Sequence, residues 1–180
     1  MATVSVYNME GNEVGTIELS DAVFGVEVNE HLVHMAVVAQ LANKRQGTQK
    51  ATRAPQWTGG GVVFAPVPRD YTIRLNKKEK RLALKSALTS RLQENKLIVV
   101  DELKFDEIKT KNFVNVMNNL KADKALVVLN ENDANVVMSA RNIPTVKTAL
   151  TNTINVYDIL KYNTLILTKD AVATIEEVYA

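Results

Sequence analysis

The chain has 180 residues, of which 46% are hydrophobic and 23% charged, with a net charge of +2, a balance typical of a globular domain rather than a disordered polypeptide. It contains no cysteine, which excludes disulfides, a thiolate nucleophile and cysteine-based metal sites. No apolar run approaches the roughly 18 residues of a membrane span, and the start resembles no signal peptide, so we expect a cytoplasmic protein.

Unequal blocks of charge make up the small net charge. Residues 1–43 carry six acids and no Lys or Arg, residues 44–91 carry twelve cations and two acids, and residues 92–180 have a net charge of −2. Natural surfaces usually intersperse both signs. The cationic block has no clean apolar face for a bilayer, so it favours nucleic acid over a membrane as the partner.

The first elements in chain order are two short strands, at residues 4–8 and 16–19, joined by a turn. A helix then begins after Asn29, a favoured N-cap residue, and ends at the basic turn before Gly47. Residues 47–70 are rich in Gly and Pro, which predicts a long irregular loop, and loops of this length are usually functional or disordered.

A second helix is predicted from Asn76, as its cap, to about Gln93. Its leucine stripe is flanked by Arg81 and Lys85, so it is not cleanly amphipathic. Two further helices are expected to be capped by Thr110 and Asp170. Three apolar runs, each followed by a helix-like stretch, read as strands at 97–100, 125–129 and 164–168.

Short Val- and Leu-rich strands alternating with helices predict an α/β fold, a mostly parallel sheet with helices on both faces. The sequence has no internal repeat and no clear linker. We therefore expect one globular RNA-binding domain over residues 1–180, with the basic loop at about 47–70 inserted in it.

Catalytic motifs are missing from the sequence. No glycine-rich phosphate loop opens a helix, because Gly61 precedes the strand-like run 62–64. His31 and His34 share a helical face but have no indicated third metal ligand. No serine lies in a nucleophile-elbow context. We expect no enzyme, no catalytic residue, no metal, no cofactor and no small-molecule substrate.

The residue types of the cationic block suit RNA. Arg offers a planar fork for phosphate, Lys a point charge, and Trp57 and Tyr71 flat faces for stacking on unpaired bases. The glycines permit close approach to a sugar–phosphate chain. The alternative is that the cations form a solvated surface and that Trp57 fills the core.

Five stretches resemble, in order, the signature stretches of the bacterial L-four family of large-subunit ribosomal proteins, and the resemblance runs essentially end to end. The stretches are 44–50, 55–64, 66–71, 81–86 and 139–144.

That resemblance implies an α/β domain bound directly to large-subunit (23S) ribosomal RNA and to neighbouring ribosomal proteins. It also implies a role early in subunit assembly and a loop reaching toward the nascent-peptide exit tunnel. An RNA- or nucleotide-processing enzyme and a free-standing regulatory RNA binder are the alternatives. By resemblance, RNA contacts fall on Lys44, Arg45, Gln46, Gly47, Thr48, Lys50, Arg53, Gln56, Trp57, Gly59, Gly60, Gly61, Arg69, Lys77, Lys78, Lys80, Arg81, Lys85, Arg141 and Asn142.

The chain departs from the family pattern most clearly inside the loop. Only four residues separate Lys50 from Pro55, where the family has an Arg- and Gly-rich extension several times longer. Natural shortening, excision or omission of residues would each produce this string. The handful of residues between Gln49 and Pro55 would project only about 10 Å, so we expect the loop to stop short of the tunnel.

Overall fold

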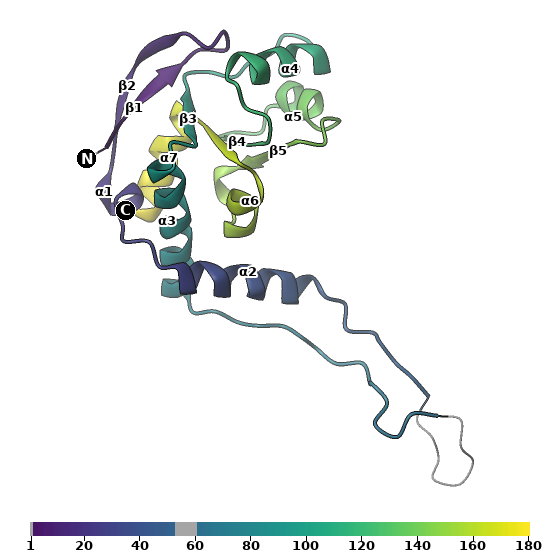
Figure 1. Ribbon diagram of the computed structural model, residues 1–180. Coiled ribbons are helices and arrows are strands. Elements are labelled where there is room, and N and C mark those ends of the chain that lie inside the picture. The colour runs from purple at the N-terminus through teal and green to yellow at the C-terminus, as the bar shows by residue number, and fades with distance from the viewer. Residues whose placement is uncertain (1, 53–60) are drawn as a thin grey trace.

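The computed structural model describes residues 2–52 and 61–180. Its strands form one sheet, and its helices pack around that sheet (Figure 1). The strands are β1 (Ala2–Tyr7), β2 (Glu13–Leu19), β3 (Leu97–Val100), β4 (Ala125–Leu129), β5 (Val146–Leu150) and β6 (Thr164–Thr168). The α-helices are α1 (Asp21–Phe24), α2 (Glu30–Lys44), α3 (Lys77–Gln93), α4 (Thr110–Asn119), α5 (Ala134–Ala140), α6 (Val156–Lys161) and α7 (Lys169–Tyr179), with a 3-10 turn, η1 (Thr151–Thr153).

The strand order is β2-β1-β3-β6-β4-β5. In the described part of the chain, β1 and β2 pair antiparallel, as the predicted hairpin, and the other four pairings are parallel. All five residues of β4 are buried, which is typical of a parallel strand covered on both faces. The predicted mostly parallel sheet is confirmed.

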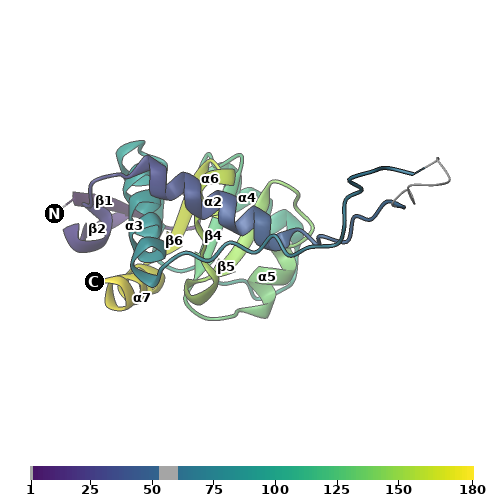
Figure 2. The same ribbon diagram turned by 90° about the horizontal axis from the view of Figure 1, so that it is seen from below.

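Successive β4 side chains point to opposite faces of the sheet. Leu126 and Val128 belong to a core that contains residues of α1, α3, α6 and α7, with α2 packed outside. Val127 belongs to a second core, with Phe113 of α4 and Val136 of α5. Helices therefore cover both faces (Figures 1 and 2), as predicted.

Between α2 and α3 the chain leaves the body as two extended legs, residues 45–52 and 61–76 (Figure 1). The prolines at 66 and 68 have no N–H to donate, so the legs form no continuous ladder. Isolated backbone bonds join them instead, from Arg69 N to Gly47 O at 3.1 Å and from Ala51 N to Pro66 O at 3.3 Å.

One expectation about this loop is wrong. The run 62–64 is an isolated bridge and a turn rather than a strand. The projection of about 10 Å expected for the residues between Gln49 and Pro55 stays a prediction, and the legs below them begin at the ends of α2 and α3. Eight extended residues, 45–52, span up to about 28 Å.

The observed N-terminal caps of four helices can be compared with the predicted ones. Asn29 Oδ1 accepts from Leu32 N at 3.1 Å, and Asn76 N donates to the Glu79 carboxylate at 3.0 Å, so both asparagines precede their helices as expected. The other two predictions are one or two residues off. Lys109 is the N-cap of α4, and Thr168 caps α7 by accepting from Ala171 N.

Candidate nucleic-acid interface

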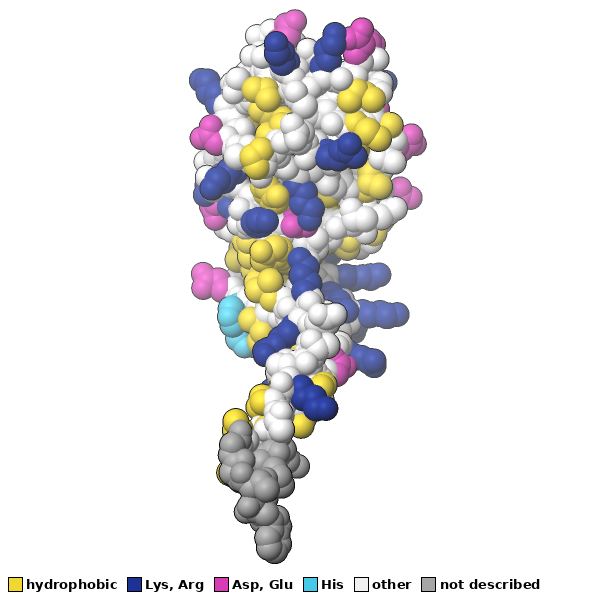
Figure 3. Space-filling model, turned by 90° about the vertical axis from the view of Figure 1, so that its right-hand side faces the viewer, with side chains coloured by type: hydrophobic (Ala, Val, Ile, Leu, Met, Phe, Trp, Pro, Cys, Tyr) yellow, Lys and Arg dark blue, Asp and Glu magenta, His cyan; other side chains and the backbone are white. Residues whose placement is uncertain are grey.

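Cationic side chains gather on the loop legs and on the first turns of α3, where they surround the root of the loop (Figure 3). Each of the following predicted RNA-contacting residues in this region is exposed: Lys44, Arg45, Gln46, Thr48, Lys50, Arg69, Lys77, Lys78, Lys80 and Arg81.

Tyr71 joins the two legs. The guanidinium carbon of Arg45 lies 3.9 Å from the centroid of its ring, and that of Arg69 lies 4.3 Å away. Gln49 Nε2 donates to the Tyr71 hydroxyl. A hydrogen bond from the Arg69 side chain, together with the charge of Arg45, lowers the pKa of that hydroxyl below its ordinary value. A guanidinium stacked on a ring keeps most of its N–H donors free for phosphate.

This arrangement changes the expected role of Tyr71. Its ring already packs against two guanidinium groups of its own chain, so it is not a free platform for a base. Its position lets it orient Arg45 and Arg69 instead.

Gly47 is buried where the two legs meet, with φ at +70°. A Cβ at this position would lie 2.1 Å from Arg69 O, closer than real contacts allow. Glycine is therefore needed here for the two legs to meet. Its predicted RNA contact stays a prediction.

The root of the loop keeps its positive charge. Within residues 2–52 and 61–180, no salt bridge neutralises Lys77, Lys78, Lys80 or Arg81. The acid of the second leg, Asp70, accepts from the hydroxyl and amide of Thr72, which lower the pKa of the carboxyl below its ordinary value.

Arg91 is a cation of the same block with a different role. Its side chain is buried, and it donates to the carbonyls of Ile159 and Leu160 at 3.1 and 3.0 Å and to Glu94 at 2.9 Å. It therefore closes the end of α6 against α3. The buried side of α3 also holds Ser86 and Thr89 beside its alanines and leucines, so the helix is not cleanly amphipathic, as predicted.

The other predicted residues are distributed less tightly. Lys85 and Gly61 are half-buried. Arg141 and Asn142 are exposed at the end of α5, far from the loop (Figure 1), so the fold does not bring them to the cationic root. Further predictions fall outside the described residues: Arg53, Gln56, Trp57, Gly59 and Gly60.

Exposed apolar side chains near the outer part of the loop were missed by the sequence reasoning. Val62, Val63 and Phe64 are 54%, 70% and 89% exposed. Their signal was the apolar run after the glycines, which we interpreted as a strand. Such a patch usually marks a surface that a partner covers.

The helices and the histidines give no sign of other chemistry. His31 and His34 are both exposed on α2. Among the described residues, no three metal-binding side chains come together, and no helix is long and apolar enough to cross a membrane.

The fold and this site define a class of α/β protein that extends a cationic two-legged loop from between two helices of its body. The sequence model described as "Ribosomal protein L4/L1 family" matches residues 17–53 and 49–178. The chain belongs to this family.

Similar proteins are each named large ribosomal subunit protein uL4. Identity is 65% with the protein of Agathobacter rectalis, 62% with that of Lachnoclostridium phytofermentans and 61% with that of Lachnospira eligens. Each alignment covers 100% of both chains over 206 positions.

These alignments also locate the shortened segment. The 206 aligned positions exceed the 180 residues of this chain by 26. The family match breaks into two parts that meet at residues 49–53, inside the loop. The shortening relative to the family therefore lies at the outer part of the loop, while the legs and α3 are retained.

Proposed function

We propose that this protein is a structural constituent of the large ribosomal subunit that binds large-subunit ribosomal RNA directly and contacts neighbouring ribosomal proteins. Membership of the ribosomal protein L4/L1 family carries this proposal, and the uncompensated cations at the loop root support it. The family consists of structural ribosomal proteins, not enzymes, and bacterial ribosomes work in the cytoplasm.

Binding works by phosphate neutralisation on a surface arranged in advance. Arg45 and Arg69 are held by the Tyr71 ring, which reduces the side-chain freedom that each loses when it meets a phosphate. Lys and Arg at the start of α3 add charge along one helical face. The exposed apolar run 62–64 becomes buried against RNA or against a neighbouring protein.

The proposed RNA contacts are those predicted from the sequence, with the loop legs and the start of α3 as the main surface. Arg141 and Asn142 form a second, separate contact. A role early in subunit assembly is consistent with direct binding to RNA, because a protein that needs no partner protein can bind the RNA before other ribosomal proteins do.

Salt titration of RNA binding tests this function. We expect the purified protein to bind large-subunit ribosomal RNA transcribed in vitro, with affinity falling by roughly 10³ to 10⁵ between 50 and 200 mM salt if about 6 to 10 phosphates are contacted. A filter-binding series measures the slope. Absence of binding, or a flat salt profile, would contradict the proposal.

A further inference from the structure

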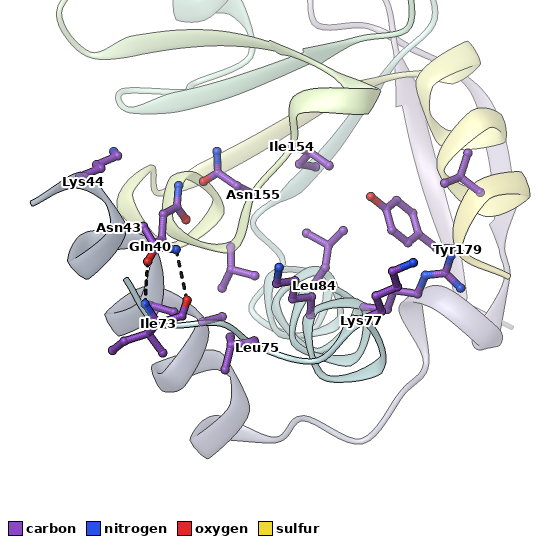
Figure 4. Close-up of a pocket in the computed structure, with 16 residues that line it drawn as sticks. Gln40, Asn43, Lys44, Ile73, Leu75, Lys77, Leu84, Ile154, Asn155 and Tyr179 are labelled. Carbon is purple, nitrogen blue, oxygen red and sulfur yellow. Dashed lines mark hydrogen bonds between the residues drawn. The ribbon is translucent and has the colours of Figure 1, made fainter. Parts of the chain in front are cut away.

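A groove of about 760 Å³ lies beside the root of the loop. Its walls come from α2, from the second leg at residues 73–75, from α3, from the chain before α6 and from the end of α7 (Figure 4). That volume is within the range of small-molecule pockets, about 300 to 1,000 Å³. It has room for an unpaired nucleotide.

The floor of the groove is apolar and includes one aromatic ring. Leu84 and Val156 are buried, and Ile73 and Ile154 are half-buried. Tyr179, near the end of α7, is half-buried and lies around the same space as Leu84 and Ile154 (Figure 4). Flat aromatic and aliphatic surfaces of this kind stack against bases of any sequence.

Every charged residue that lines the groove, within residues 2–52 and 61–180, is a cation. These residues, which form its rim, are Lys44, Lys77, Lys80 and Arg81. Lys80 and Arg81 follow Lys77 by three and four positions, which puts the three side chains on one face of α3. The occupant that complements this surface has an apolar flat part and flanking negative charges.

One amide in the groove is available to a ligand. Asn43 is engaged with the backbone of Ile73, at 2.9 and 3.3 Å, and Asn155 with Asp158. Gln40, between them on the wall, makes no side-chain hydrogen bond within the part of the chain that the structure describes. A primary amide can donate to and accept from the edge of a base.

We infer that this groove receives one unpaired nucleotide of ribosomal RNA, with its base against Leu84 and Tyr179 and its flanking phosphates on the lysines and arginine of the rim. The inference rests on the proposed function and names a specific site within it. An acidic peptide would match the rim, but the flat apolar floor and the free amide favour a base. The groove also continues the cationic legs, so one RNA strand can contact both.

Variants at position 179 test the inference with in vitro transcribed large-subunit ribosomal RNA as the probe. Replacing Tyr179 by Ala removes the ring and no charge. We expect the dissociation constant to rise about 5- to 150-fold, by the usual stacking range, with an unchanged salt slope. Chemical probing should show one unpaired nucleotide losing its protection. Tyr179→Phe, which keeps the ring, is the matched control and should bind like the wild type.

Three outcomes would overturn the inference. If the wild type binds RNA and Tyr179→Ala gives the same affinity and footprint, the groove is not a base site although the proposed function stands. If the wild type binds no RNA, both fail. A photo-crosslinking residue at 179 that labels only protein in isolated large subunits would assign the groove to a peptide instead. Should Tyr179→Ala lose cooperative melting, Gln40→Ala, with a two- to tenfold expected weakening, replaces it.

Discussion

Tyr71 shows how one side chain can set the geometry of the loop. Cation–π contacts at exposed sites contribute about 0.5 to 1 kcal/mol each, and Tyr71 makes two. We therefore expect Tyr71→Leu to weaken RNA binding by about 5- to 30-fold while the melting temperature of the free protein barely changes. Tyr71→Phe keeps the ring and loses the Gln49 bond, so its effect should be smaller. Equal binding by Tyr71→Leu and the wild type would show that the stack does not prepare the site.

Arg91 is the opposite case, a cation of the same block that serves the fold. Replacing it by Met leaves the carbonyls of Ile159 and Leu160 without their donor. We expect the free energy of unfolding to fall by about 2 to 3 kcal/mol, measured by urea denaturation. The salt slope of RNA binding should stay unchanged. A reduced slope with full stability would instead place Arg91 at the RNA.

Helix α3 combines these two roles at its two ends, and the cations of its first turns can be tested separately. Replacing Lys77, Lys78, Lys80 and Arg81 with Gln should reduce the salt slope by about three to four, at roughly 0.9 per phosphate contact. The fold should persist, because exposed cations contribute little to stability.

A control with the same loss of charge uses cations outside the cationic block. Lys104, Lys109, Lys111 and Lys121 are also exposed, and replacing them with Gln should leave the slope as it is. If both sets of four reduce it equally, RNA binding follows net charge rather than a surface at the loop root.

The elements that the sequence predicts are those with a strong local signal. The Val-rich run of β4 and the cap at Asn29 belong to this group. The caps predicted at Thr110 and Asp170 are wrong for different reasons. Lys109 N donates to Ser139 Oγ of α5, which is a tertiary contact. Thr168 is a local cap two residues before Asp170, because its hydroxyl accepts from Ala171 N. Strand β5 was not predicted, because Lys147 and Thr148 interrupt the continuous apolar run that marked the other parallel strands.

The residue types of the site could be predicted from the sequence, but their arrangement in space could not. Twelve cations in one block point to a polyanion from sequence alone. Arg45 and Tyr71, which pair across the two legs, are 26 positions apart in the sequence. Glycine is required at position 47 because the carbonyl oxygen of Arg69 lies against it. No local pattern reports such contacts. The groove beside the loop draws its walls from several separate elements, so it also emerges only in three dimensions.

At the scale of the whole molecule, the loop decides how far the protein reaches into the subunit. The 26 missing positions, divided between two legs, shorten the reach by up to about 45 Å. We therefore expect this protein to bind ribosomal RNA through the loop root without forming part of the exit-tunnel wall. Intact mass of the protein from its source is the first check, because a mass well above 19.9 kDa would mean that the longer loop exists.

Crosslinking from a stalled nascent chain measures that reach. We expect it to label other tunnel components and to miss Lys50 and Thr52, whereas the 65% identical protein of Agathobacter rectalis should be labelled in its longer loop. Efficient crosslinks to Lys50 would contradict the shortened reach.

Sedimentation is the most direct test of the claim that this protein is a constituent of the large ribosomal subunit. A tagged copy expressed in its native cell should migrate with large subunits in a sucrose gradient and remain there after a moderate salt wash, at about one copy per subunit. Recovery of the protein only at the top of the gradient, free or bound to other RNA, would contradict the account.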